Sequence, residues 1–530
     1  MLQRIISFNL FKEGSLDTII KKKVDLKEKY RLMTRDLGWN LSYVKEDDVY
    51  DHAKYEGIKI HDWDKWEDPF RLTVDAYWKY QSEKERKLYA IIDAFVQNNG
   101  HLTVTDARYI NALKLWLNGI TPMEYSAHKS FSRTARQFKG IGASIACQMQ
   151  SIDELRHAQT QIHSMSNYNR FYNGMDDWHH KSDHMWYYQV PKSFFQDAES
   201  AGPFEFITAI SFSFEYLLTN LLFVPFVSGA AYNGDMAAMT FGFSAQSDEA
   251  RHMTLGLEVI KFMLEQDPDN LPIVQGWIDK WAWRGIRLLT LVAMMQDYML
   301  PKRVMSWREA WDIYFEDNGM ALFNDLARYG IKVPECIEQT RKEKNHISHQ
   351  AWLTFNSVNF LTNFHTWIPK KEELDWLSAK YPETFDQYYR PRFEYLQKLE
   401  DQGEPFLNKA LPLTCQVCLI PAFYTEVENP TQLVHEECVY MGEKFQFCSV
   451  PCRKIFEREP EKYVQALVPD HQIYQGNCFP EGTNPTAEGF DPIQAVADFY
   501  DLETGKENGG FKGSEDEANF ARWRDQTTKN

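Results

Sequence analysis

Two five-residue words of one type, Asp-Glu-x-Arg-His, begin 95 residues apart in this chain. Each word places a glutamate three residues before a histidine, Glu154 with His157 in the first copy and Glu249 with His252 in the second. Side chains three residues apart share one face of an α-helix, so each word presents a carboxylate beside an imidazole. Such a pair is half of a binding site for a metal that prefers oxygen and nitrogen ligands.

Two further glutamates stand where a helical bundle would bring them to the same point. Glu124 precedes Glu154 by 30 residues and Glu215 precedes Glu249 by 34 residues, and each gap fits one helix, a turn and an antiparallel partner. Four carboxylates balance the charge of two Fe(II) ions, whereas without a metal they would repel one another and take up protons. A lone Glu-x-x-His is more often a surface ion pair, but its recurrence with two matching glutamates favours a metal site. A set without thiolates favours iron or manganese, so the sequence predicts a di-iron centre with six ligands: Glu124, Glu154, His157, Glu215, Glu249 and His252.

The aspartate and the arginine of the repeated word can support the metal ligands. A histidine that binds a metal normally donates its second ring N–H to a carboxylate. Asp153 and Asp248 are the candidates for this role, each serving the histidine of the other helix. Arg156 and Arg251 can pair with these aspartates and keep them ionised.

Glu215 lies in an almost wholly apolar run, FITAISFSFEYLLTNLLFVPF, where an unpartnered carboxylate would be costly. The run is long enough to mimic a membrane span, but the carboxylate at its centre favours a buried helix of a soluble protein without a membrane partner. Thr219 follows on the same face one turn later, near any bound oxygen species. Asn220 and Gln246 add polar groups in this neighbourhood. For these three residues, hydrogen bonding between helices and a catalytic role in proton delivery or gating both remain open.

Cysteines indicate a second metal site. Five of the eight cysteines lie between residues 415 and 452, which is not the pattern of a secreted disulfide scaffold. Cys415 and Cys418 form a C-x2-C pair, and Cys448 and Cys452 form a C-x3-C pair that follows after 29 residues. Four thiolates close a tetrahedral site and leave no open position, so we predict structural zinc. Two other residues of ligand type lie between the pairs and are held as alternatives: His435 and Cys438.

The rest of the sequence supplies the domains and helices that position these motifs. The formal net charge of −17 over 530 residues argues against a general nucleic-acid binder, and the N-terminal apolar run is too short for a secretory signal, so we expect a cytoplasmic protein. The chain divides into an N-terminal arm with helices (1–95), a di-iron helical bundle (96–300), a helical extension (301–404), a four-cysteine zinc-binding module (405–470) and a polar C-terminal tail (471–530). Apolar periodicity predicts the helices of the bundle at Asp106–Asn118, Pro122–Ala146, Ile152–Asn167, Pro203–Leu222, Gly234–Glu265 and Leu271–Tyr298.

The six predicted ligands, the two repeated words and the peptide EYLLTN together resemble the large subunit of bacterial multicomponent monooxygenases. Within that family, KYEGIKIHDWDKWEDPFRLTVDAYWKYQSEKE and NNGHLTVTDARYINALKLWLNGITPMEY resemble the oxygenase component of the phenol hydroxylase branch. The resemblance implies a mainly α fold with a ferritin-like four-helix-bundle di-iron core, helical extensions and a small four-cysteine module near the C-terminus. By position, Thr219 matches the active-site threonine of the family. Ile120 and Ala127, one turn either side of Glu124, match substrate-pocket positions, although core packing explains them equally well.

The resemblance also implies an activity and partners. In that family a reduced di-iron centre and O2 hydroxylate an aromatic ring, and the second oxygen atom leaves as water. Electrons come from NADH through a separate reductase that carries FAD and a [2Fe-2S] cluster, and a small effector protein is required. The large subunit assembles with two smaller subunits as a dimer of trimers. For this chain the branch favours phenol and methylphenols, which would give catechols.

Other functions fit less well. The radical-generating subunit of ribonucleotide reductase usually has Asp as first ligand and Tyr one turn after the first histidine, whereas this chain has Glu124 and Gln161. An iron-storage bundle would be much shorter. A benzene or toluene monooxygenase large subunit remains an alternative, as does a non-catalytic structural paralogue, although such a paralogue would be expected to lose ligands.

Overall fold

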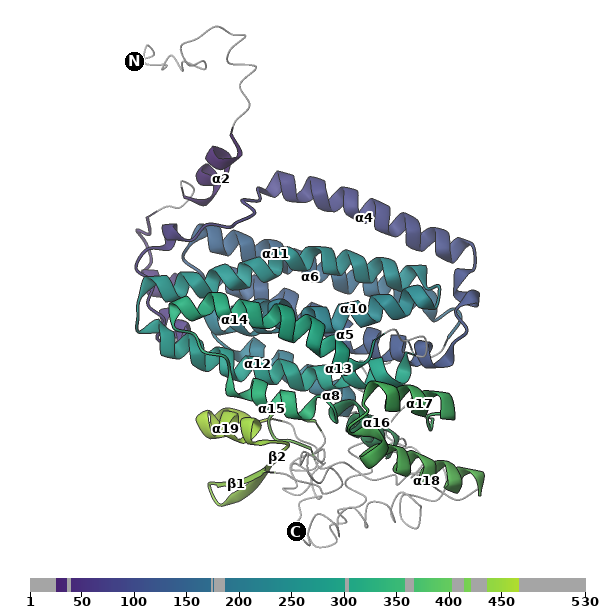
Figure 1. Ribbon diagram of the computed structural model, residues 1–530. Helices are drawn as coiled ribbons and strands as arrows, with labels where there is room; N and C mark the ends of the chain where they lie inside the picture. Colours follow the sequence, from purple (N-terminus) through teal and green to yellow (C-terminus); the bar gives the residue numbers. More distant parts are fainter. Residues whose placement is uncertain are drawn as a thin grey trace, which may run out of the picture.

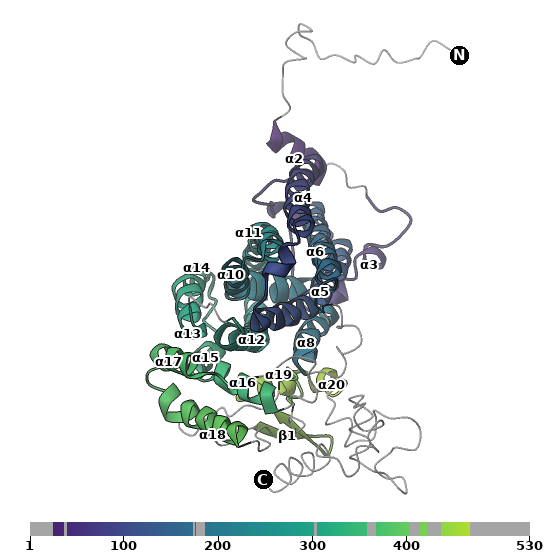
Figure 2. The ribbon, with the colours of Figure 1, turned by 90° about the vertical axis from the view of Figure 1, so that its right-hand side faces the viewer.

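The computed structural model describes residues 25–35, 40–172, 175, 186–300, 305–357, 367–402, 414–420 and 436–466. The expectations for the first 24 residues, for His435 and for the polar tail lie outside the described residues. Long helices lie side by side along one direction, and a small module with the chain's described strands lies against one side of them (Figure 1). Viewed along the helices, α4 covers α6 and α11 on the side away from that module (Figure 2).

The elements fall into four groups along the chain. Those of the N-terminal part are α2 (Leu26–Thr34), α3 (Glu46–Val49), η1 (His52–Tyr55), η2 (Trp63–Lys65), α4 (Val74–Gln97) and η3 (Gly100–Thr103). Those of the bundle are α5 (Ala107–Gln137), α6 (Ile141–Tyr168), α8 (Trp186–Ser200), α9 (Pro203–Ile207), η4 (Thr208–Tyr216), α10 (Leu217–Tyr232), α11 (Met236–Gln266), α12 (Asn270–Met294) and η5 (Met295–Met299). Those of the extension are α13 (Trp307–Ala310), η6 (Trp311–Gly319), α14 (Met320–Leu326), η7 (Ala327–Tyr329), α15 (Glu335–Glu343), α16 (Ile347–Ser357), α17 (Lys371–Lys380), η9 (Phe385–Tyr389) and α18 (Arg390–Asp401). Those of the C-terminal module are β1 (Glu436–Tyr440), β2 (Glu443–Phe447), α19 (Val450–Arg458) and α20 (Pro460–Tyr463), with the two strands antiparallel.

The first two helices of the bundle begin and end at other residues than predicted. A break was expected before Pro122, but α5 continues through this proline. The buried face that includes Leu117, Ile120 and Met123 offsets the one hydrogen bond that a proline cannot donate. The break lies instead at Phe138–Gly140, where extended backbone at Gly140 begins α6.

The helix that carries Glu215 has an unusual middle. Residues 203–232 form one continuous helical run, and η4 within it is a π-helix, which periodicity did not predict. This run is long and apolar enough to cross a membrane, but 83% of its most apolar window is buried inside the protein. Among the described residues it is the single helix that meets these criteria, and its burial is that of a core helix.

Gly256 allows α11 to approach η4 closely. A Cβ at this position would lie 2.5 Å from the carbonyl carbon of Ser211 and 2.6 Å from the backbone nitrogen of Phe212. Because backbone atoms in a buried helix cannot give way, Gly256→Ala should lower the free energy of unfolding by about 1–3 kcal/mol. Chemical denaturation measures this effect. Gly119→Ala is the matched control, since a Cβ there would meet nothing within 4 Å, and an equal loss in both variants would contradict the packing argument.

The arm before α4 is fastened to the bundle by a pair of carboxyl groups. Gly202 donates its backbone N–H to Glu56 Oε1 at 3.0 Å, and the Glu56 carboxyl lies beside that of Glu205. Glu205 in turn accepts from Lys280 Nζ at 2.9 Å and Trp281 Nε1 at 2.8 Å. Burial and the neighbouring Glu205 raise the pKa of Glu56 to about 7. The pair therefore holds a proton in the folded protein.

This proton makes stability depend on pH. The unfolded chain releases it near the ordinary pKa of 4.5, so folding binds a proton between about pH 4.5 and 7, and stability falls as pH rises through that window. Glu56→Gln removes the titrating group. We expect the melting temperature of this variant to rise above that of the wild type as pH increases from 4.5 to 7 in thermal unfolding. The same substitution at the exposed Glu383 should give a difference that does not vary with pH.

Candidate metal centres

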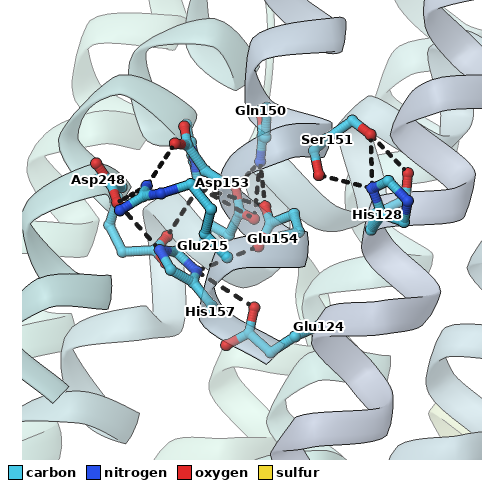
Figure 3. A network of polar contacts seen from close by, with 12 residues as sticks. Glu124, His128, Gln150, Ser151, Asp153, Glu154, His157, Glu215 and Asp248 are labelled. Carbon is cyan, nitrogen blue, oxygen red and sulfur yellow. Dashed lines mark hydrogen bonds and ion pairs between the residues drawn. The ribbon is translucent and has the colours of Figure 1, made fainter. Parts of the chain in front are cut away.

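Four elements bring the six predicted di-iron ligands to one place inside the bundle. Each ligand side chain is buried, and none is more than 9% exposed. The contributions by element are Glu124 from α5, Glu154 and His157 from α6, Glu215 from η4, and Glu249 and His252 from α11. Figure 3 shows Glu124, Glu154, His157 and Glu215 pointing toward one another.

Glu154 lies at the centre of this group. Its Oε2 is 3.6 Å from His157 Nδ1, and its Oε1 is 3.4 Å from His252 Nδ1. Glu124 Oε2 lies 3.4 Å from His157 Nδ1, and Glu215 Oε1 lies 3.8 Å from His252 Nδ1. Two clusters of possible ligand atoms result, and Glu154 belongs to both. One carboxylate thus faces both clusters.

Glu249 contacts the second cluster from one turn away on α11, although it does not itself belong to either cluster. Its Oε2 is 3.7 Å from His252 Nδ1 and is buried without a hydrogen-bond partner. The Nδ1 atoms of His157 and His252 are likewise buried without a hydrogen-bond partner. Leaving three such atoms unsatisfied is costly, and a pair of divalent ions would satisfy all of them. The residues present therefore fit the di-iron group.

The protonation of the cluster supports the same fit. Burial and the charge of Glu249 raise the pKa of Glu215 well above its ordinary value. Burial alone would lower the pKa of His157, but the adjacent Glu124 and the contact with Asp248 raise it well above the usual range. The metal-free cluster holds protons that a bound cation would displace.

Each aspartate of the repeated words contacts the histidine on the other helix. His157 Nε2 lies 3.1 Å from Asp248 Oδ2, and His252 Nε2 lies 3.3 Å from Asp153 Oδ2. Donation of each Nε2–H to a carboxylate leaves the Nδ1 lone pair free to face the ligand cluster. Arg156 and Arg251 both contact both aspartates, as four ion pairs.

Two buried glutamines also belong to the site and were not predicted. Gln150 Nε2 donates to Glu154 Oε1 and to both oxygens of Glu215, each at 3.0 Å, and Ser211 Oγ donates to Gln150 Oε1 at 3.2 Å (Figure 3). Gln161 Nε2 donates to Glu124 Oε1 at 3.3 Å. Each glutamine is one turn from a ligand of α6 on the same face, and this spacing is the signal that could have identified them.

An apolar cavity adjoins the ligand cluster. Ile120, Ala127 and Thr219, the predicted pocket residues and threonine, all line it. Four glutamates of the ligand group also line it: Glu124, Glu154, Glu215 and Glu249. The rest of the wall is apolar and comes from four elements: Met123, Phe195, Ile210, Phe214, Leu222 and Phe223. Asn220 and Gln246 are half-buried and lie outside this wall. The volume of this cavity is about 30 Å³, which is room for about one water molecule, so a small flat ring could enter only if the apolar side chains of the wall moved.

The four predicted zinc ligands also meet. Cys415, Cys418, Cys448 and Cys452 are buried, and their sulfur atoms all lie within 4.8 Å of one another. Burial opposes ionisation, but hydrogen bonds from the other three cysteines hold the pKa of Cys415 well below its usual range. Cys438, the alternative ligand, lies in β1 and does not belong to this cluster.

Helix α12 joins this module to the bundle. Trp283 Nε1 donates to Cys452 Sγ at 3.2 Å, and Arg284 donates to the carbonyl oxygen of Val417 at 2.8 Å. On another side of the same helix, a Cβ at Gly285 would lie 2.6 Å from Leu218 Cδ1, next to Thr219. One helix therefore packs against both candidate metal sites.

Together, a ferritin-like bundle, paired Glu-x-x-His half-sites and an apolar cavity define an oxygenase large subunit of the carboxylate-bridged di-iron class. Residues 39–267 match the sequence model of the Methane/Phenol/Alkene Hydroxylase family, and residues 427–467 match that of the YHS domain. The chain is 60% identical over 507 residues to phenol 2-monooxygenase, oxygenase component DmpN, of Pseudomonas sp. (strain CF600), with 96% of each chain covered. The chain belongs to the methane, phenol and alkene hydroxylase family, and the predicted resemblance to phenol hydroxylase oxygenase components is confirmed.

Two further relatives agree with this assignment. The crystal structure of xenon-pressurized phenol hydroxylase from Pseudomonas sp. OX1 matches with a TM-score of 0.85 and 60% identity, covering 94% of this chain and 99% of that one. The methane monooxygenase component A alpha chain of Methylococcus capsulatus is 24% identical over 420 residues, which covers 74% of this chain and 77% of the relative. Both curated relatives are named as components, an oxygenase component in one case and component A in the other.

Proposed function

We propose that this chain is the large subunit of a phenol hydroxylase, which uses O2 and electrons from NADH to convert phenol and methylphenols to catechols. The observation that carries the proposal is a group of six buried carboxylates and imidazoles beside an apolar cavity; five of them form two clusters of possible ligand atoms, and the sixth, Glu249, contacts His252. It occurs in a chain 60% identical to a phenol 2-monooxygenase oxygenase component. A non-catalytic paralogue would not be expected to keep the complete ligand set.

In this proposal each residue has a role. Glu124, Glu154 and His157 would hold one iron, and Glu215, Glu249 and His252 would hold the other, with Glu154 facing both clusters. When bound, the di-iron group supplies the reduction of O2 and the transfer of one oxygen atom to the ring. The four-cysteine group, Cys415, Cys418, Cys448 and Cys452, holds structural zinc, because a closed set of four thiolates leaves no position for substrate.

The protein's own side chains prepare the reaction. Asp153 and Asp248 fix the tautomers of the histidines, and Arg156 and Arg251 keep these aspartates ionised. The wall that includes Ile120 and Ala127 excludes water and holds the ring flat against the site. Thr219 can hold a proton at its Oγ1 at the edge of the cavity. Asn220 and Gln246, outside the wall, suit proton delivery from the surface.

Other components complete the system. We propose two smaller subunits in a dimer of trimers, a small effector protein and a reductase that carries FAD and a [2Fe-2S] cluster to pass electrons from NADH. The apolar helical run of residues 203–232 lies mostly inside the protein, and this position suits a cytoplasmic assembly without a membrane partner.

A competition assay tests the substrate. The assembled complex, with small subunits, effector and reductase, receives NADH, O2 and equal phenol and toluene, and products are followed over time. Early catechol with little cresol is the expected result. Early cresol would instead favour the benzene or toluene branch of the family. Phenol carries a hydroxyl group where toluene carries a methyl group, and the polar residues of the cavity wall that could bind this hydroxyl are Thr219 and the four glutamates.

A further inference from the structure

The two Asp-Glu-x-Arg-His words are alike in sequence, but the side chains of α4 make different contacts with their two aspartates. Tyr77, Gln81 and Lys84 lie on one face of α4, and this face rests on Asp153 of α6 and Asp248 of α11. Tyr77 and Gln81 are each only 1% exposed, and the Tyr77 hydroxyl and the Gln81 amide nitrogen both donate to these aspartates. Helix α4 lies over α6 and α11 (Figure 2), and through these contacts it covers the two aspartates.

Gln81 is shared between the two halves. Its Nε2 donates to Asp153 Oδ1 at 2.8 Å and to Asp248 Oδ1 at 2.9 Å. One amide nitrogen therefore joins the two equivalent carboxylates, and this contact is the same in both halves.

The other two residues of this face make the halves unlike. Tyr77 donates its hydroxyl to Asp153 Oδ1 at 2.7 Å, whereas Lys84 Nζ donates to Asp248 Oδ2 at 2.6 Å. A neutral donor thus meets the first aspartate and a cation meets the second. Asp248 Oδ2 is also the atom that His157 contacts, so Lys84 and the imidazole share one acceptor.

The two arginines do not remove this difference. Arg156 NH1 lies 3.0 Å from Asp153 Oδ1 and 3.4 Å from Asp248 Oδ2, and Arg251 contacts Asp153 more closely than Asp248. Both guanidinium groups are therefore common to the two halves. Lys84 and the Tyr77 hydroxyl each belong to one half.

We propose that α4 tunes the two metal positions separately, with Lys84 acting on the His157 position through Asp248 and Tyr77 acting on the His252 position through Asp153. This inference rests on the proposed di-iron function. A carboxylate that accepts from a ligating imidazole increases the electron donation of that imidazole to the metal. A second donor on the carboxylate weakens this effect, and a cation weakens it more than a hydroxyl does. Lys84, Tyr77 and Gln81 are positioning residues, since they act through the aspartates.

Mössbauer spectroscopy of the 57Fe-loaded hydroxylase complex tests the proposal, because each iron position contributes its own quadrupole doublet. Lys84→Met should shift one doublet and leave the other in place, and Tyr77→Phe should shift the other one. Gln81→Leu should shift both. In stepwise reduction, the iron of the affected half should become harder to reduce in each single variant, because its histidine donates more strongly.

Matched controls lie on the same helix. Lys87 is an exposed lysine paired with Glu83, and Tyr80 is an exposed tyrosine, so Lys87→Met and Tyr80→Phe make the same chemical changes away from the aspartates. Both controls should reproduce the wild-type spectrum. Lys84→Arg restores the cation and should return the doublet toward its wild-type position, which separates the effect of charge from a loss of packing.

The outcomes are distinct. If Lys84→Met and Tyr77→Phe leave both doublets unchanged, or if both move the same doublet, the inference is overturned while the proposed function stands. If the wild-type complex binds no iron, the proposed function and the inference fail together. If Lys84→Met binds iron poorly and Lys84→Arg does not rescue the spectrum, Lys84 is a packing residue and the inference is again overturned.

Discussion

Glu154→Ala should abolish retention of iron by the purified hydroxylase complex while leaving its zinc content unchanged. Glu154 places one oxygen 3.4 Å from His252 Nδ1 and the other 3.6 Å from His157 Nδ1, so the substitution removes a ligand atom from both positions at once. Loss of a supporting contact to a ligand already weakens metal binding by about 10–100-fold, and loss of a shared ligand should exceed this. Metal analysis after gel filtration gives the iron and zinc contents.

Two further variants complete this experiment. His252→Ala should also lose iron, because it removes the single nitrogen ligand of its position. Glu258→Ala is the control. Glu258 lies on the same helix as Glu249, but its Oε1 pairs with Lys261 Nζ at a distance of 3.1 Å and does not belong to the ligand cluster. Full iron occupancy in Glu154→Ala or His252→Ala would show that the ligands are misassigned.

Cys452→Ser should lose zinc and loosen the C-terminal module while the bundle still binds iron. Cys452 is fully buried, contacts Cys448 at 3.6 Å and accepts the Trp283 N–H at 3.2 Å. Structural zinc contributes ~10–16 kcal/mol of binding free energy in small zinc-dependent peptides, so a module of this size should not stay ordered without it. Limited proteolysis should give new cuts within 436–466, and the complex should melt at a lower temperature.

The matched control for this variant is Cys438→Ser. Cys438 is half-buried in β1, within the same module but outside the four-sulfur cluster. It should keep its zinc and its resistance to proteases. An intact, zinc-loaded Cys452→Ser protein would refute the structural role of the site.

Helical periodicity made much of the metal centre predictable. A glutamate and a histidine three residues apart must share a face, and two such pairs with matched glutamates leave few arrangements open. The crossed contacts of Asp153 and Asp248 follow from the same geometry, because each histidine needs an acceptor behind it. The metal roles of these residues remain predictions until iron is measured.

Other parts of the site depend on contacts that no local pattern encodes. Gln81 lies 72 residues before Asp153. The amphipathic pattern of its helix predicts that one face is buried, but it does not identify the residues that this face contacts. Gln150 has an ordinary helical position, and its role appears only when η4 brings Glu215 beside it. The π-helical turn of η4 arises from packing in a wholly buried segment, where the apolar pattern is the same for either kind of helix.

Helix α12 has a consequence for how the protein is made. It supports the Glu215 segment through Gly285 and Leu218, and it is itself held from the other side by Cys452 and the carbonyl of Val417. During synthesis the bundle leaves the ribosome well before these C-terminal residues do. A nascent or truncated chain can therefore form the four ligand helices without the support behind them. The order of translation thus delays the final packing around the proposed di-iron centre until the C-terminal module has been made.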